Sequence, residues 1–147
     1  MKNKEIIELS AGYITNTYSR FPIVITKGRG CKVWDVDGKE YLDFVAGIAV
    51  CNLGHCHPKV VKAIQEQAER LIHISNLYYI EPQARLAELL CKNSFAQKAF
   101  FCNSGAEANE AAIKLIRKYF KDKNEDKFQI ITMEQSFHGR TMATLAA

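Results

Sequence analysis

The chain has 147 residues, with 20 Lys and Arg against 16 Asp and Glu, so its formal net charge is +4. A content of 48% hydrophobic and 24% charged residues is typical of a packed soluble protein and excludes disordered, collagen-like or low-complexity chains. The basic residues alternate with acidic ones, which excludes a nucleic-acid partner. No segment has the roughly 18 apolar residues of a membrane helix or the apolar core of a signal peptide, so we expect a cytoplasmic protein with no membrane partner.

The first part of the chain is predicted to form an amino-terminal segment built around a β-hairpin. The expected elements before the hairpin are a helix at 6–17, an extended stretch at 23–25 and a turn at Gly28–Gly30. The hairpin strands are Val33–Val36 and Glu40–Asp43. Between them, Asp37 and Gly38 accept the positive φ angles of a tight turn.

Two amphipathic helices are predicted next. Apolar residues recur at helical spacing from Pro58 to Leu71, and charged residues occupy the opposite side. Residues Pro82 to Lys92 repeat this pattern, and each helix has a proline near its start, where the missing N–H costs nothing. Residues 72–80 are expected to form a loop between them.

The last third of the chain predicts one strand-helix-strand unit. The apolar runs Ala99–Cys102 and Phe128–Thr132 are the expected strands, and Ala106–Phe120 is the expected helix. Such a unit implies parallel strands with a right-handed connection, and therefore an α/β fold with a mostly parallel sheet. Because such strands are usually covered on both faces, and the chain has too few helices to do so, we expect it to be part of a longer protein.

Asn103–Ala106 lies at the carboxyl end of the first of these strands and at the amino end of the helix. Free backbone N–H groups and the helix dipole favour an anion at such a position. Gly105 would let the backbone approach a phosphate closely, and the Ser104 hydroxyl could donate a hydrogen bond to it. Glu107 in the first turn would complement the dipole and stay off the phosphate. A plain serine N-cap without a ligand is the commoner alternative.

Ser136–Thr141 follows the second predicted strand at the same edge of the sheet, where ligands bind in open α/β folds. Phe137 could stack on a flat heterocycle, and the planar guanidinium of Arg140 suits a carboxylate. In the alternative interpretation, Phe137 is a core residue and Arg140 a surface charge.

The cysteines and histidines do not predict a disulfide framework or a metal site. Five cysteines are an odd number, and without an export signal we expect them to be reduced. Cys51, His55, Cys56 and His57 are too close in sequence to surround one tetrahedral zinc ion, and no second pair follows. Gly54 is expected to make the turn before the helix at Pro58, with His57 in its cap region. Ser104 lacks the Gly-x-Ser-x-Gly elbow of a hydrolase nucleophile.

Taken together, the motifs resemble the class III aminotransferases, which use pyridoxal 5′-phosphate (PLP). The resemblance begins at Tyr18 ahead of Pro22 and covers essentially the whole chain. The further matching segments, in order, are Lys27–Gly30, Trp34–Asp35, Gly38–Phe44, Gly47–Val50, Leu53–Pro58, Ser75–Tyr78, Phe101–Ala111 and Phe137–Thr141. The last two are highly specific. The implied fold class is α/β, as the amino-terminal part of the fold type I PLP-dependent transferase fold.

The resemblance implies the cofactor site. Ser104, Gly105 and Ala106 would hold the PLP phosphate, and Phe137 would stack on the pyridine ring. Residues 1–57 would form an amino-terminal segment with the hairpin, belonging to the small domain. Residues 58–147 would form the first, incomplete part of the PLP-binding large domain.

The resemblance also implies the substrates. Arg140 would bind a substrate carboxylate, and Tyr18 would lie at the substrate entrance. The implied reaction moves the δ-amino group of N-acetylornithine to 2-oxoglutarate in arginine biosynthesis, within a homodimer. Transamination of ornithine, of succinyldiaminopimelate or of 4-aminobutyrate is the alternative within the class.

The chain departs from the family pattern in what it lacks. The Schiff-base lysine, the aspartate that pairs with the pyridine nitrogen and a second arginine all come after Ala147 in the family, so no catalytic residue is assigned here. We therefore expect a truncated chain that is inactive alone. A finished phosphate-binding module without chemistry is the alternative from another class. Expressed alone, residues 1–147 should be poorly soluble or bind hydrophobic dyes.

Overall fold

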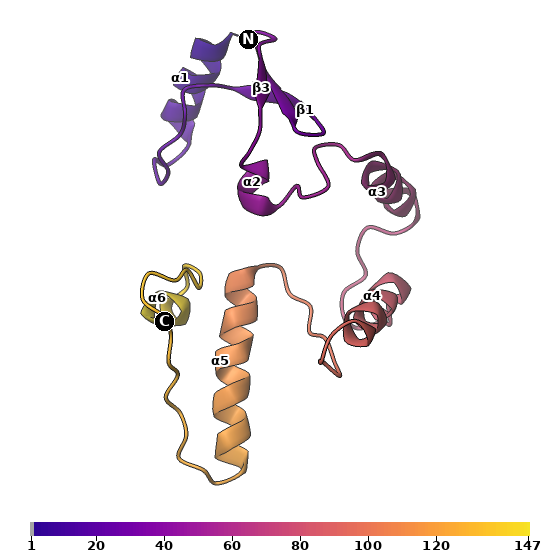
Figure 1. Cartoon of the computed structure of the whole chain (residues 1–147), viewed down its shortest axis with the longest axis vertical. Coiled ribbons are helices and arrows are strands. Elements are labelled where there is room, and N and C mark those ends of the chain that lie inside the picture. The colour runs from indigo at the N-terminus through magenta and orange to yellow at the C-terminus, as the bar shows by residue number, and fades with distance from the viewer. Residues whose placement is uncertain (1) are drawn as a thin grey trace. The chain divides into compact units, whose positions relative to one another are not determined.

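A computed structural model describes residues 2–147, and the chain forms two compact units, Met1–Ser75 and Asn76–Ala147 (Figure 1). The domain boundary predicted after residue 57 concerns the complete fold of the family and stays a prediction.

The first unit combines helices with a small antiparallel sheet of strand order β1-β2-β3. Its elements are α1 (Asn3–Tyr13), β1 (Ile25–Arg29), β2 (Lys32–Asp35), β3 (Glu40–Leu42), α2 (Ala46–Ala49) and α3 (Pro58–Arg70). The predicted hairpin is confirmed as β2 and β3, and the predicted helix at 58–71 is confirmed as α3, with His57 as its N-cap.

Asp35 organises the β2–β3 turn. Its carboxylate accepts hydrogen bonds from the Tyr41 hydroxyl at 2.7 Å and from the backbone N–H groups of Asp37 and Lys39 at 3.0 and 2.8 Å. The pKa of Asp35 lies below its ordinary value, and the hydrogen bond from the Tyr41 hydroxyl contributes most to this lowering. Gly38 has the predicted positive φ, 84°, whereas Asp37 does not have a positive φ, so only half of the prediction for the Asp-Gly pair is confirmed.

The predicted turn at Gly28–Gly30 is wrong by two residues. Gly28 and Arg29 belong to β1, and the chain turns at Gly30, with φ 58°, and Cys31. A Cβ on Gly28 would lie 2.8 Å from the Cβ of His55, so this glycine permits a close approach within the strand rather than a turn.

The first helix also differs from its predicted range of 6–17. α1 begins three residues earlier because the Glu5 carboxylate accepts a hydrogen bond from the Lys2 backbone N–H at 3.0 Å and closes the first turn. It ends at Tyr13, where the β-branched Ile14 is extended, with φ −109° and ψ 126°. β-branched residues lose side-chain freedom in a helix, so a run of them favours this ending.

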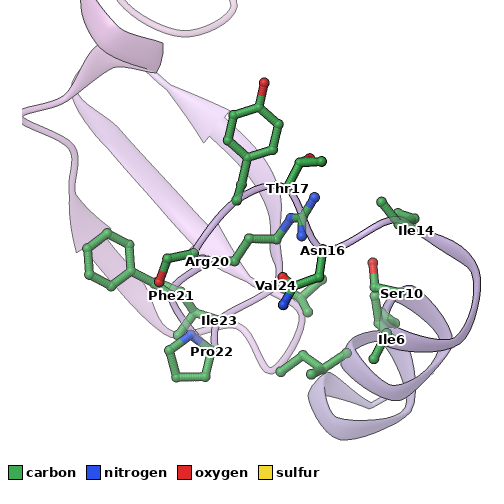
Figure 2. A pocket seen from close by; sticks show the side chains of 14 residues that line it. Ile6, Ser10, Ile14, Asn16, Thr17, Arg20, Phe21, Pro22, Ile23 and Val24 are labelled. Atoms are coloured by element: carbon green, nitrogen blue, oxygen red, sulfur yellow. The ribbon is translucent and has the colours of Figure 1, made fainter.

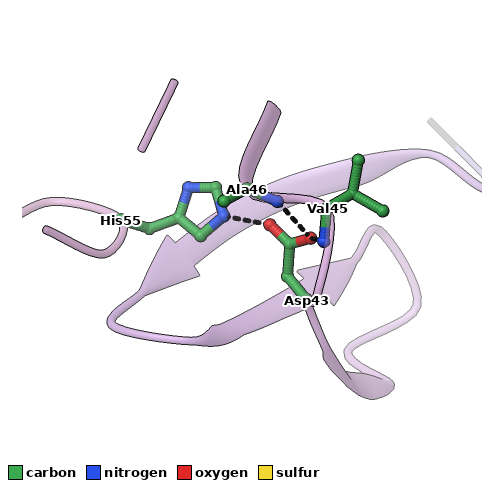
Figure 3. Close-up of polar contacts among 4 residues, drawn as sticks. All are labelled: Asp43, Val45, Ala46 and His55. Carbon is green, nitrogen blue, oxygen red and sulfur yellow. Dashed lines mark hydrogen bonds and ion pairs between the residues drawn. The ribbon is translucent and has the colours of Figure 1, made fainter. Parts of the chain in front are cut away.

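The segment after β3 is fixed to the sheet through Asp43 and His55 (Figure 3). One Asp43 oxygen accepts from the backbone N–H groups of Val45 and Ala46 at 2.8 and 2.9 Å, and the other lies 2.6 Å from His55 Nε2. An ionised carboxylate only accepts, so Nε2 carries the proton. The His55 backbone also exchanges two hydrogen bonds with Gly30. Residues 43–46 and 55 are therefore held against the turn between β1 and β2.

Acid should weaken this anchor. The His55 contact, followed by the two backbone N–H groups, holds the pKa of Asp43 below its ordinary value. A carboxyl group with a lowered folded-state pKa stabilises the fold above its unfolded pKa, about 3.9, and loses that contribution as the pH falls. The measurement is the free energy of urea unfolding of the complete gene product between pH 7 and pH 3. In Asp43→Asn this free energy should fall less steeply at acid pH than in the wild type. The control is Asp126→Asn, at an exposed position. The expectation would be contradicted if the free energy of unfolding of Asp43→Asn fell with acid as steeply as that of the wild type.

The second unit contains α4 (Glu81–Lys92), α5 (Gly105–Asp122) and α6 (Met142–Ala146). The helices predicted at 82–92 and 106–120 and the loop at 72–80 are confirmed. After α5, the chain runs back beside that helix, and α6 lies near its amino-terminal end (Figure 1).

The two predicted parallel strands are not formed. Residues 99–102 and 128–132 carry no strand, and their backbone groups make no backbone hydrogen bonds within residues 2–147. A strand exists only through pairing with a neighbour, and apolar composition alone supplies none. The predicted parallel crossover is therefore wrong for this chain, although the order of apolar run, helix and apolar run is as predicted.

Apolar surface is widely uncovered. No hydrophobic side chain among the described residues is buried, and in the second predicted strand Ile131 is 93% exposed. Residues 1–147 expressed alone should therefore bind the dye ANS strongly and aggregate at micromolar concentration. A cooperative thermal transition from a monodisperse monomer would contradict this expectation.

Candidate active site

The amino-terminal end of α5 presents free backbone donors. The Ser104 hydroxyl oxygen caps the helix by accepting from the Glu107 N–H at 3.2 Å, which leaves the hydroxyl hydrogen able to donate. The Glu107 carboxylate turns back and accepts a hydrogen bond from the backbone N–H of Asn103, the residue before the N-cap, at 2.6 Å. The N–H groups of Gly105 and Ala106 donate to no acceptor within residues 2–147.

This end of the helix also has room for a ligand. A Cβ built on Gly105 would meet no atom within 4 Å. Two free N–H groups, one hydroxyl and the positive end of an 18-residue helix face that space. The residues present therefore fit a phosphate group.

The second predicted motif meets the first through Gly139. This glycine is buried with a φ of 136°, and a Cβ on it would lie 2.8 Å from the Cβ of Ala106 and 2.7 Å from Thr144 Oγ1. The loop carrying Phe137 and Arg140 is thus in direct contact with the amino-terminal turn of α5. Sequence reasoning expected both motifs at one mouth, and the structure brings them together without the sheet.

Phe137 and Arg140 are close to each other at this place. The Arg140 guanidinium carbon lies 5.9 Å from the centre of the Phe137 ring. Phe137 is 75% exposed, so it is not a core residue in this chain. An exposed ring and a guanidinium beside a helix end with free N–H donors suit a flat, anionic ligand together with a carboxylate.

Tyr18 belongs to the first unit. It lines a cavity of about 810 Å³ between α1 and the segment of residues 14–24 (Figure 2). The Arg20 guanidinium carbon lies 5.9 Å from its ring centre. Its predicted place at the substrate entrance stays a prediction.

The histidines and cysteines considered as metal ligands or disulfide partners form neither a metal site nor a disulfide among the described residues. His55 pairs with Asp43, and within residues 2–147 no three His, Cys, Asp or Glu side chains gather as a metal site would require. All five cysteines are free thiols. None of the described helices is both long enough and apolar enough to cross a membrane.

Sequence reasoning missed the contact that Asn109 makes at this site. The Asn109 side-chain amide donates to the His138 backbone carbonyl at 2.6 Å. The signal available was spacing, because Asn109 lies three residues after Ala106 and thus on the same helix face.

These features place a helix end with free backbone donors beside an arginine-bearing loop, and comparison with known proteins assigns the class. The profile of the family described as aminotransferase class-III matches residues 13–147. The chain belongs to this family. A relative named acetylornithine aminotransferase, from Methanocaldococcus jannaschii, is 55% identical over 148 residues, covering 100% of this chain and 37% of that protein.

Solved structures of related enzymes have the same fold. The ornithine aminotransferase of Toxoplasma gondii ME49 aligns with a TM-score of 0.88 and 29% identity, covering 100% of this chain and 35% of its own. The taurine:2-oxoglutarate aminotransferase of Bifidobacterium kashiwanohense, solved with PLP and glutamate, aligns with a TM-score of 0.86 and 32% identity, covering 98% and 32%. The predicted α/β fold class, the amino-terminal part of the type I fold, is confirmed. The chain spans about a third of the length of these proteins.

Proposed function

We propose that this chain is the amino-terminal part of a PLP-dependent aminotransferase that moves the δ-amino group of N-acetylornithine to 2-oxoglutarate, a step of arginine biosynthesis. The observation that carries the proposal is the contact of Gly139 with Ala106, which joins a phosphate-binding helix end to an arginine-bearing loop. The proposal includes a homodimer in the cytoplasm and a lysine supplied by sequence after Ala147.

The cofactor assignment rests on the free donors at α5. The N–H groups of Gly105 and Ala106 and the Ser104 hydroxyl would hold the phosphate, and Phe137 would lie on the pyridine ring. When bound, PLP withdraws electrons from the carbon that carries the amino group. The chain itself contributes binding and orientation. It anchors the phosphate, fixes the plane of the ring and excludes water from the covered ring face.

The substrate assignment rests on Arg140 and on relatedness. Both 2-oxoglutarate and N-acetylornithine carry a carboxylate distant from the reacting group, so one guanidinium can serve both in turn and set which amine reaches the cofactor. Eight curated relatives that are 48–59% identical to this chain are all named acetylornithine aminotransferase, which favours the acetylated donor.

The proposal is tested on the complete gene product. Its intact mass is measured before and after borohydride reduction, which turns a lysine-bound cofactor into a stable adduct. We expect a mass well above 16.7 kDa, an added cofactor mass after reduction, and faster glutamate formation from N-acetylornithine than from ornithine, succinyldiaminopimelate or 4-aminobutyrate. A complete product of 16.7 kDa that gains no adduct would refute the enzyme and leave a non-catalytic fragment.

Ser104→Ala should weaken PLP binding by about 10- to 100-fold, because it removes a hydrogen bond to a charged phosphate. It also removes the N-cap of α5. The measurement is the dissociation constant of PLP for the apoprotein, from fluorescence quenching. Ser104→Thr should retain most of the affinity. Ser94→Ala is the matched control, since Ser94 Oγ also accepts a backbone hydrogen bond, from Ala96 at 3.2 Å. Equal affinities in Ser104→Ala and Ser94→Ala would contradict the assignment.

A further inference from the structure

One face of α5 carries three neighbouring residues that all contact the loop at residues 137–141. Ala106, Asn109 and Glu110 have the spacing i, i+3 and i+4, which places them on the same side of a helix. Ala106 lies against Gly139, as described above. The two polar members of this face have partners in the same loop.

Asn109 holds the loop on the amino side of Gly139. Its side-chain amide donates to the backbone carbonyl of His138 at 2.6 Å. This carbonyl lies between Phe137 and Arg140 in the chain. Asn109 is itself partly buried, so an unpaired carbonyl here would be costly.

Glu110 holds the loop on the carboxyl side of Arg140. The Thr141 hydroxyl donates to Glu110 Oε1 at 2.6 Å. The Thr141 hydroxyl oxygen also lies 2.8 Å from Thr144 Oγ1. In addition, Thr144 Oγ1 accepts a hydrogen bond from the Thr141 backbone N–H at 2.9 Å. Thr144 is only 3% exposed, so this small network ends on a fixed side chain.

We propose that Asn109 and Glu110 are positioning residues, which fix the loop on both sides of Arg140 so that its guanidinium is held ready for a substrate carboxylate. This inference rests on the proposed function. Neither residue touches the phosphate-binding groups of the Ser104 turn. The inference therefore separates two properties of the site: carboxylate affinity depends on Asn109 and Glu110, and phosphate affinity does not.

The physical reason is preorganisation. Arg140 is a long, exposed side chain, and its reach is defined only if the backbone that carries it is fixed. The hydrogen bonds of Asn109 and Glu110 and the close contact of Gly139 fix three positions next to it, His138, Gly139 and Thr141. Loss of one hydrogen bond would allow the loop to move, so that binding would have to order it again.

The test uses the complete gene product and two probes. Glutarate, a dicarboxylate with neither amine nor ketone, reports on the carboxylate site by calorimetry, and PLP fluorescence reports on phosphate binding to the apoprotein. Asn109→Ala and Glu110→Ala should each weaken glutarate binding about three- to tenfold and leave PLP affinity within about twofold. Glu110→Gln keeps the acceptor oxygen and should restore wild-type binding. Lys118→Ala is the control, because it removes an exposed ion pair with Asp122 further along α5.

The outcomes are distinguishable. Glutarate affinity unchanged in both alanine variants would overturn the positioning role while leaving the proposed function intact. An equal loss of glutarate and PLP affinity, without rescue by Glu110→Gln, would mean general destabilisation of α5 and would also overturn it. A wild-type protein that binds neither probe would overturn the proposed function, and the inference with it.

Discussion

Replacing Gly139 with alanine should destabilise the protein by at least about 2 kcal/mol and abolish measurable glutarate binding. The glycine has a φ of 136°, a region that side chains occupy only under strain of about 1–3 kcal/mol. The added Cβ would also lie 2.7 Å from Thr144 Oγ1 and 2.8 Å from the Cβ of Ala106, and such overpacking costs about 1–3 kcal/mol more. Both effects push the arginine-bearing loop away from α5.

Urea unfolding and glutarate calorimetry on the complete gene product measure the two losses. The matched control is Gly12→Ala in α1, where an added Cβ meets nothing within 4 Å. Because alanine favours a helix over glycine, this control should be neutral or slightly stabilising. If Gly139→Ala behaved like Gly12→Ala, the contact between the two motifs could not be what forms the site.

Arg140→Ala should raise the KM for both 2-oxoglutarate and the amino donor by about 10- to 100-fold, because charge-assisted hydrogen bonds to a carboxylate are lost. A single arginine that serves both substrates predicts parallel losses in the two half-reactions. Arg140→Lys should recover only part of the affinity, since an ammonium keeps the charge but not the two-pronged geometry.

Steady-state kinetics with each substrate varied in turn check this expectation. Arg85→Ala in α4 is the matched control, because its guanidinium makes an exposed ion pair with Glu81 at 2.9 Å. Such pairs contribute little, so its KM values should equal those of the wild type. A rise in KM for one substrate alone would assign the other carboxylate to a different residue.

Local patterns in the sequence were sufficient for α3, α4, α5 and the β2–β3 hairpin, but they misplaced α1 and missed α2 and α6. Prolines at the first turn and one-sided apolar spacing predicted α3 and α4, and the Asp-Gly pair predicted the β2–β3 turn. The strands at 99–102 and 128–132 failed because a strand is a property of two segments and no partner pairs with them within residues 2–147. The prediction of a turn at Gly28 was wrong for a similar reason, since the role of this glycine depends on its contact with His55, 27 positions further along the chain.

The candidate site divides in the same way. The Ser104 cap and the open helix end were predictable because they need only four consecutive residues. The partners of Asn109 and Glu110 were not, because they lie in a loop whose path depends on three-dimensional packing. The helical spacing from Ala106 predicts that Asn109 and Glu110 share its face of α5, but it does not predict that the loop at residues 137–141 contacts this face.

The contacts between α5 and the arginine-bearing loop have a consequence for folding during synthesis. They join residues only 29 and 31 positions apart, and the entropy cost of closing such a loop grows only with the logarithm of its length. Because chains are made from the amino terminus, the amino-terminal turn of α5 and the arginine-bearing loop can meet on the ribosome once α6 has emerged. Cysteine cross-linking between positions 109 and 138 in stalled nascent chains would detect this early assembly, and its absence there would refute it.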